Sequence, residues 1–525
     1  MTPPMLRRFS DALLPDGRLR TEGPPVRPGP GAPHAVVVGA GFGGLAAAIR
    51  LGARGYRVTV VDRLDQPGGR ARVLRQDGFV FDAGPTVVTA PFLFEELWAL
   101  CGKRLEDDVD LRPVSPFYRI RFDDGTRFDY TGDSDAMREE IARFAPDDVA
   151  GYDAFLAQSK EIFDVGFSKL AHVPFDGALD MARVAPAMMR LESYLTVAQL
   201  VGKHVKNEKV RQVLSFHPLL VGGNPYSTTS IYTLIAYLER KWGVWFPMGG
   251  TGELVKGLVG LIEGLGGEVR LGAEVEEIVV ECGMRGQGVA KGVKLASGET
   301  IRADLVVSNA DSAWTYYHLV PEKWRRRWTN RRLEKSDYSM SLFVWYFGTK
   351  RKYEDVAHHT ILLGPRYRGL LEDIFDAKVL ADDFSLYLHR PTATDPGMAP
   401  EGCDAFYVLS PVPHLDADVD WRTETERYRR AVSRYLEEAM LPGLEENLVV
   451  SETLTPQGFL DDYLSFKGAA FGIQPTLLQS AYFRPHNRSE DVEGLYLVGA
   501  GTHPGAGMPG VLSTARVLDT IVPDP

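Results

Sequence analysis

The clearest apolar pattern in the chain lies in HAVVVGAGFGGLAAAIRLGARGYRVTVVDR, residues 34–63. The apolar run 35–38 is typical of a buried parallel strand, and the β-branched run 58–61 is typical of the next strand. A glycine-rich turn and a stretch rich in alanine and leucine separate the two runs. The pattern therefore predicts a strand, a glycine turn, a helix and a second strand, in that order.

Further along the chain the apolar pattern changes twice. Residues 150–245 are predicted to be mostly helical, with apolar stretches interrupted by Pro and Gly. From residue 247 we expect a glycine turn, a helix and strands, including a hairpin at 296–298. Alternating segments rich in aromatic residues favour an antiparallel sheet. The further strands are expected at 305–307, 338–347, 384–389 and 495–498.

Segments typical of a nucleotide-binding domain thus occur at the start, the middle and the end of the chain. We expect an α/β (α+β) fold in which a discontinuous Rossmann-like cofactor domain carries inserted segments. The predicted cofactor domain comprises 34–115, 247–312 and 485–525, and an antiparallel-sheet substrate domain comprises 116–140 and 313–484. Residues 141–246 are predicted to be a helical insertion. Residues 1–33 are predicted to be a disordered extension, in which 4–14 could form a short amphipathic helix.

The sequence GAGFGG, residues 39–44, matches the G-x-G-x-x-G pattern in the expected context, after a strand and at the start of a helix. Gly39 allows the tight turn, Gly41 lets the backbone approach a pyrophosphate, and Gly44 lets helix and strand pack closely. Asp62 ends the next strand, about 20 residues on, where an acid binds ribose hydroxyls and repels a 2′-phosphate. The alternative is a purely structural glycine turn.

A second match, GAGMPG at 505–510, follows Thr-His-Pro rather than a strand, so we do not expect it to be an independent nucleotide site. Pro509 suits the first turn of a helix that continues through VLSTARVL. A glycine-lined loop that presents a helix N-terminus favours negative charge. This segment is therefore predicted to face the same ligand as the first glycine turn.

Length, charge and cysteine content narrow the function further. The 525 residues suggest two or three subdomains, and a formal net charge of −11 argues against nucleic acid as a partner. Three distant cysteines exclude a disulfide framework or a paired-cysteine metal site, so no metal is expected. No run of 18 apolar residues exists, and the N-terminal segment lacks the apolar core of a secretion signal. We expect a cytoplasmic protein.

After Asp62 the chain reads RLDQPGGRA, which gives an acid, five residues and then Gly68-Gly69-Arg70. This motif resembles the glutathione-reductase-type FAD proteins of the amine oxidase superfamily, in which the acid is usually Glu. Longer blocks are similar to the bacterial-type phytoene desaturases (phytoene dehydrogenases), which are FAD-dependent carotenoid desaturases. These blocks are GFVFDAGPTVVT, SFHPLLVGGNPYSTTSIYTLI, ERKWGVWFPMGGTGELV, HHTILLGPRYR, DFSLYLH, APEGCDAFYVLSPVPHL, QSAYFRPHNR and LYLVGAGTHPGAGMPGV.

The resemblance covers about residues 35–520 and implies one FAD, held by segments from both ends of the chain. The dinucleotide's AMP half is expected on the first glycine turn and Asp62, and the flavin ring beside 499–510, where the helix N-terminus favours the negative charge of the reduced ring. The cofactor-binding residues implied in this way are Gly39, Gly41, Gly44, Asp62, Gly68, Gly69, Arg70, Val275, Gly499, Gly501, Thr502, Gly507, Met508 and Pro509.

The resemblance also implies an activity in carotenoid biosynthesis. Phytoene, a C40 hydrocarbon, would lose a hydride to flavin N5 and then a proton from the neighbouring carbon, in steps toward neurosporene or lycopene. Its binding calls for a long apolar tunnel. The alternatives are a desaturase of C30 diapophytoene or of hydroxy- or methoxy-neurosporene and, in another class, a prenyl-binding protein of the same fold that is not an enzyme.

Three residues are candidates for the proton chemistry. Asp180 and Arg183 are three positions apart on a predicted helix, so they either take part in catalysis or form an ordinary surface ion pair. His503 lies in the loop that the resemblance puts near the flavin, and it is either a proton relay or a residue that fixes the loop. Water, or no protein base at all, is a further alternative.

With one nucleotide site and no thiol pair, the electrons are expected to pass to a quinone or oxygen. A substrate of this kind lies in the bilayer, so peripheral association with the cell membrane is expected. One candidate contact is 172–195 with the basic stretch 202–211, and the other is KWRRRWTNRR at 323–332, where Trp324 and Trp328 alternate with arginines. Their alternative role is that of a solvated helix face.

Overall fold

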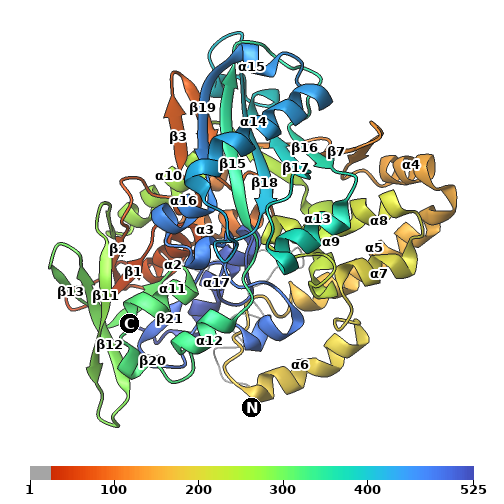
Figure 1. Ribbon diagram of the computed structural model, residues 1–525. Coiled ribbons are helices and arrows are strands. Elements are labelled where there is room, and N and C mark those ends of the chain that lie inside the picture. The colour runs from red at the N-terminus through yellow and green to blue at the C-terminus, as the bar shows by residue number, and fades with distance from the viewer. Residues whose placement is uncertain (1–24) are drawn as a thin grey trace.

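The computed structural model describes residues 25–525 (Figure 1). Most of the predicted disordered extension, including the helix considered at 4–14, lies outside the described residues. The remaining part follows the body of the protein, where the Val26 amide donates a hydrogen bond to the carbonyl of Ala53 at 3.1 Å.

A five-stranded parallel sheet forms the base of the molecule. Its strand order is β10 (Glu268–Arg270), β2 (Arg57–Val61), β1 (His34–Val38), β14 (Leu305–Ser308) and β21 (Leu495–Leu497). These strands come from the start, the middle and the end of the chain, within the three segments predicted for the cofactor domain. The fold class is therefore a mixed α/β fold.

The two faces of this sheet are covered differently. Because successive side chains of a strand point to opposite faces, Ala35 and Val37 pack with the helices, whereas Val36 and Val38 pack against a smaller sheet. The helices are α2 (Phe42–Ala53), α3 (Phe92–Leu100), α10 (Thr251–Gly264) and α17 (Met508–Ile521). The smaller sheet contains β11 (Val275–Cys282), β12 (Gly288–Leu295), β13 (Thr300–Arg302) and β20 (Val492–Glu493). The hairpin predicted at 296–298 joins β12 to β13.

A seven-stranded sheet stands above the parallel sheet (Figure 1). All its neighbouring strands are antiparallel except the parallel pair β16–β7. The predicted segments 338–347 and 384–389 supply two of its strands. Its order is β19 (Leu448–Leu454), β15 (Ser341–Thr349), β18 (Asp404–Val412), β17 (Leu386–His389), β16 (His359–Leu363), β7 (Tyr118–Phe122) and β8 (Arg127–Tyr130).

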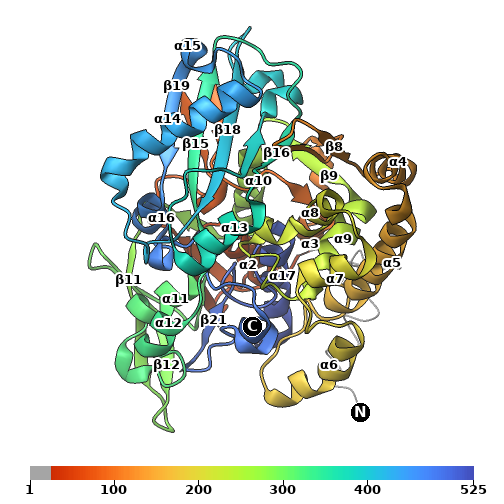
Figure 2. The ribbon, with the colours of Figure 1, turned by 45° about the vertical axis from the view of Figure 1, so that its right-hand side comes forward.

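Helix α14 (Trp421–Ala439) covers the outer face of the seven-stranded sheet (Figure 2). Phe343, Trp345 and Phe347 of β15 pack beneath it. Two small sheets connect the larger ones. In the first, β3 (Val73–Gln76) pairs with β4 (Phe79–Asp82), and in the second, β9 (Val244–Pro247) pairs with β5 (Val88–Thr89) and β6 (Leu111–Pro113). The remaining short helices are α11 (Ser312–Trp314), α12 (Asn330–Lys335), α13 (Tyr367–Glu372), α15 (Leu444–Asn447) and α16 (Pro456–Tyr463).

The segment predicted to be helical, 150–245, and the helix before it form a separate group of helices beside both sheets (Figures 1 and 2). Helix α6 lies at the lower edge in both views. Within residues 25–525, no helix is long and apolar enough to cross a membrane. The group consists of α4 (Ser134–Phe144), α5 (Val149–Gly166), α6 (Ala178–Arg190), α7 (Val197–His204), α8 (Glu208–Ser215) and α9 (Leu234–Trp242).

The packing of α2 on β1 gives a first prediction. A β-carbon at Gly44 would lie 2.0 Å from the carbonyl oxygen of Gly39, whereas one at Gly260, in α10, would meet nothing within 4 Å. We expect Gly44→Ala to lower the free energy of unfolding by at least about 2 kcal/mol, because backbone would have to move. The control Gly260→Ala should stabilise by about 0.5–1 kcal/mol. Thermal unfolding measures both, and equal midpoints for the two variants would contradict the packing argument.

Candidate cofactor and substrate site

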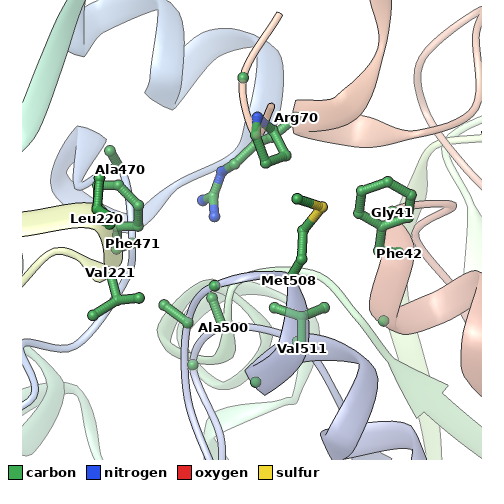
Figure 3. Close-up of a pocket in the computed structure, with 18 of the residues that line it drawn as sticks. Gly41, Phe42, Arg70, Leu220, Val221, Ala470, Phe471, Ala500, Met508 and Val511 are labelled. Atoms are coloured by element: carbon green, nitrogen blue, oxygen red, sulfur yellow. The ribbon is translucent and has the colours of Figure 1, made fainter. Parts of the chain in front are cut away.

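One large cavity of about 560 Å³ lies between the parallel sheet and the seven-stranded sheet. At one end its wall includes the strand ends Val38 and Val61, and at the other it includes Leu342, Ile361 and Leu409 of the upper sheet. Figure 3 shows part of the cavity, with Arg70, Phe471 and Met508 around it. The cavity therefore has a polar end beside the glycine turns and a long apolar end.

The first glycine turn closes the polar end. Gly39 has a φ of +95°, which favours glycine, and Gly41 is the N-cap residue of α2. A β-carbon at Gly41 would lie 2.9 Å from the side-chain amide nitrogen of Asn309. Gly44 does not line the cavity but permits the close helix–strand packing that the sequence predicted. The N-terminus of α2 can thus approach an anionic group directly.

Asn309 is a site residue that the sequence analysis missed. It follows β14, its amide donates to the Val38 carbonyl at 2.8 Å, and its side chain would meet a β-carbon at Gly43 or Gly499. A polar residue immediately after a buried parallel strand was the available signal, because ligands of open α/β sheets bind at the carboxyl ends of the strands.

Asp62 ends β2 beside the glycine turn. Its carboxylate accepts hydrogen bonds from the amides of Ala40 at 2.6 Å and Leu64 at 2.9 Å. Burial raises the pKa of Asp62, and the two amides oppose that shift. Val275, the first residue of β11, lines the same end of the cavity. These contacts orient the carboxylate and leave it further lone pairs for ligand hydroxyls.

The Gly68-Gly69-Arg70 motif lies against the first glycine turn. The Gly68 amide donates to the Ala40 carbonyl at 2.8 Å, and both glycines have positive φ. The Arg70 guanidinium extends into the cavity (Figure 3) and donates to Ser465 Oγ at 2.7 Å. Burial lowers the pKa of Arg70, and the carboxylate of Asp311 opposes that shift. A buried cation with one neutral hydrogen-bond partner suits an anionic or carbonyl-rich ligand.

The C-terminal loop forms the opposite wall of the cavity. Gly499, Gly501, Gly507, Met508 and Pro509 all line it, and Gly507 is the N-cap residue of α17. Pro509 stands in the first turn of that helix, as the sequence predicted.

Thr502 was also predicted to bind the cofactor, but its side chain takes a different position. It is fully buried and donates to the Pro485 carbonyl at 2.6 Å, and it is not among the residues that line the cavity. It therefore anchors the loop.

The three predicted proton-transfer residues are far from equivalent. His503 lines the cavity, donates from Nε2 to the Leu170 carbonyl at 2.9 Å, and has its pKa lowered to about 4 by burial. Asp180 accepts from the Gly177 amide at 3.0 Å and pairs with Arg183 at 3.3 Å. The Arg183 side chain is 77% exposed, and neither residue of the pair lines the cavity. Their geometry is that of a helix cap and a surface ion pair.

A group of three histidines could hold a metal ion. His358, His359 and His389 are buried, and one ring nitrogen of each lies within 4.8 Å of the others. Burial lowers the pKa of all three, so the rings are neutral at neutral pH. The group lies behind the cavity wall, where His359 Nδ1 is 2.7 Å from the hydroxyl of the lining residue Tyr387.

The residues at the polar end fit a flavin dinucleotide. Two helix N-termini, a guanidinium and the acid that follows β2 face one cavity, and the lack of β-carbons at Gly41 and Gly43 lets Asn309 lie against the first glycine turn. The cavity then continues into a region that is lined by apolar side chains such as Leu342, Ile361 and Leu409. This arrangement can place a redox cofactor next to an apolar substrate.

Comparisons with known proteins agree with this geometry. The family model "flavin containing amine oxidoreductase" matches residues 42–517. The chain is 50% identical to a lycopene-forming phytoene desaturase of Pseudescherichia vulneris, over 93% of this chain and 98% of that protein. It is 48% identical to a neurosporene-forming phytoene desaturase of Cereibacter sphaeroides, over 95% and 96% of the two chains.

Among solved structures, an oxidoreductase from Methanosarcina mazei superimposes with a TM-score of 0.59 at 18% identity, over 92% of this chain and 99% of the other. At that identity the likeness concerns the fold alone, which is thus of the amine-oxidase type.

The Asp62 contacts predict a specific loss of cofactor. Asp62→Ala leaves the amides of Ala40 and Leu64 without this acceptor, which costs about 1–3 kcal/mol, and removes the acid that is expected to face the ribose. We expect the purified variant to lose most of its flavin, measured as the ratio of flavin to protein absorbance. The control is Asp304→Ala, because Asp304 accepts from the His34 amide at 2.8 Å at the other end of β1. Equal flavin loss in both variants would mean that the effect is general destabilisation.

Proposed function

The chain belongs to the flavin-containing amine oxidoreductases and, within them, to the bacterial phytoene desaturases, and on this basis we propose that it desaturates phytoene in carotenoid biosynthesis. It is an FAD-dependent oxidoreductase that acts on CH–CH groups. The observation that carries the substrate proposal is a cavity that joins the proposed flavin cradle to an apolar region.

Bound FAD supplies a two-electron acceptor for a hydride. The residues proposed to hold it are twelve of the fourteen expected from the sequence, with Asn309 added; Gly44 and Thr502 act only through packing and loop anchoring. Arg70 and the N-terminus of α17 would face the part of the cofactor on which negative charge develops upon reduction.

The apolar end of the cavity suits a hydrocarbon. Residues of β15 contribute Leu342 and Val344 to its wall, and β16 contributes Ile361. A substrate without polar groups gains binding energy only from such surface. Curated relatives of similar identity form neurosporene or lycopene, so either product is compatible with the proposal.

A membrane-facing role is proposed for the helical insertion. On α6, Leu179 is 74% exposed and Met189 is 62% exposed, and Tyr194 beyond it is 53% exposed. Met181 and Met188 of the same helix line the cavity. A helix that joins an exposed apolar surface to the cavity suits a peripheral contact through which a lipid-soluble substrate enters.

The second predicted membrane segment, 323–332, does not present the aromatic surface on which its prediction rested. Trp328 is 1% exposed and donates from Nε1 to Glu490 at 2.9 Å. Arg332 lies over the Trp328 ring, 3.9 Å from its centroid. Trp328 thus packs inside the protein and Trp324 is only partly exposed, so 172–195 is the segment that we propose to contact the bilayer.

The roles of His503, Asp180 and Arg183 stay predictions. The hydrogen bond of His503 to the Leu170 carbonyl supports the loop-fixing role. The exposed pair Asp180–Arg183 supports the role of a helix-capping ion pair.

The substrate proposal is tested by half-reactions. Without oxygen, phytoene in lipid vesicles should reduce the bound flavin, seen as loss of its visible absorbance, and the extracted pigment should show a longer conjugated system. Reoxidation should follow addition of a quinone or air. A flavin that stays oxidised with phytoene but is reduced by diapophytoene would favour the C30 alternative, and strict dependence on NAD would contradict the proposed electron acceptors.

The membrane proposal predicts that negative charges introduced on the exposed face of α6 weaken binding to vesicles. Leu179→Asp with Met189→Asp should reduce co-flotation with anionic vesicles at least tenfold, because the apolar contact is replaced by repulsive charge. Val449→Asp is the control, since Val449 is 50% exposed on β19, away from α6. Vesicle binding that survives in the α6 variant would rule out this contact.

A further inference from the structure

Removal of a hydride and a proton from neighbouring carbons needs a proton acceptor, and the cavity contains one that no motif indicated. We infer that Glu239 is the base that takes the proton from the substrate. This inference rests on the proposed desaturase function. Glu239 lies on α9, one residue after Leu238 and four after Ile235, and all three line the cavity.

Glu239 is unusual because it is an acid in an apolar wall. The described acids that line the cavity are Asp62, Glu239, Glu274, Asp311 and Asp462. The four others have different partners: Asp62 binds two amides beside the glycine turn, Glu274 pairs with Arg63, Asp462 pairs with Arg72, and Asp311 caps α11. Glu239 is 1% exposed, and the residues beside it on the same face of α9, Leu238 and Ile235, are apolar.

The carboxylate of Glu239 is held by two groups behind the wall. The Tyr118 hydroxyl donates to Oε1 at 2.6 Å, and His217 Nε2 lies 3.2 Å from Oε2. Neither Tyr118 nor His217 lines the cavity. Within the described residues, no Lys or Arg forms an ion pair with Glu239. Each oxygen thus retains a lone pair, and burying such a group costs free energy that a leucine in its place would not cost.

The chemistry of the proposed reaction accounts for this cost. After the hydride has left one carbon with its electron pair, the substrate carries an allylic cation. The C–H bond of the neighbouring carbon then breaks, its electron pair becomes the new carbon–carbon double bond, and the proton forms an O–H bond on Glu239. In an apolar cavity the carboxylate also attracts the cation strongly.

The test compares Glu239→Gln with wild type in the anaerobic half-reaction. Glu239→Gln keeps the shape of the side chain but cannot accept a proton, so we expect product formation to slow by about 10²–10⁴-fold. Flavin content and phytoene binding should stay unchanged. Glu239→Asp should recover part of the rate, and Glu161→Gln, at an exposed acid on α5, should behave as wild type.

Isotope effects separate a base from a structural group. Phytoene is deuterated at one or the other carbon of the bond that becomes double. If Glu239 is the base, Glu239→Gln raises the deuterium isotope effect at the carbon that loses the proton. The isotope effect at the carbon that loses the hydride does not increase. Unchanged isotope effects, or a rate within threefold of wild type, would overturn the inference. If wild type fails to reduce its flavin with phytoene, the proposed function itself is wrong.

Discussion

The close approach of α2 to the carboxyl ends of β1 and β14 is the contact on which the rest of the site depends. It brings the helix to within van der Waals distance of the Gly39 carbonyl and of Asn309, which only residues without a β-carbon permit at Gly43 and Gly44. The helix N-terminus thereby faces the cavity instead of solvent. Asn309 in turn contacts the loop at Gly499, so one side chain links three distant segments of the chain.

The two faces of the seven-stranded sheet border different regions, because the same strands cover a protein core on one face and the apolar cavity on the other. In β15, Leu342 and Val344 face the cavity, whereas Phe343, Trp345 and Phe347 pack under α14. The two-residue period of a strand makes this division automatic. It also explains why this segment is buried along its whole length, although its sequence is only moderately alternating.

Local patterns predicted the parts of the fold that depend on neighbouring residues. The first strand–turn–helix–strand unit, the hairpin after β12 and the start of α17 at Pro509 follow from strand period, turn chemistry and helix capping. The resemblance to a family added further residues that are expected to bind the cofactor, among them Arg70 and Met508, which line the cavity. Neither source assigned a role to Asn309 or Glu239. The position of Asn309 after a buried strand was a usable signal, whereas the setting of Glu239 depends on Tyr118, which is 121 positions away in the sequence. Conversely, the spacing of Asp180 and Arg183 predicted their ion pair but carried no information about their distance from the cavity.

The second G-x-G-x-x-G match is explained by packing. A β-carbon at Gly505 would lie 2.5 Å from the buried guanidinium of Arg484, and one at Gly510 would lie 2.6 Å from the Gly505 carbonyl. Gly501 similarly leaves room for Ser312 Oγ. These glycines let the loop fold tightly before α17, and the tight fold brings the helix N-terminus to the cavity. The same sequence motif therefore occurs twice for different physical reasons, and only the first occurrence directly follows a strand.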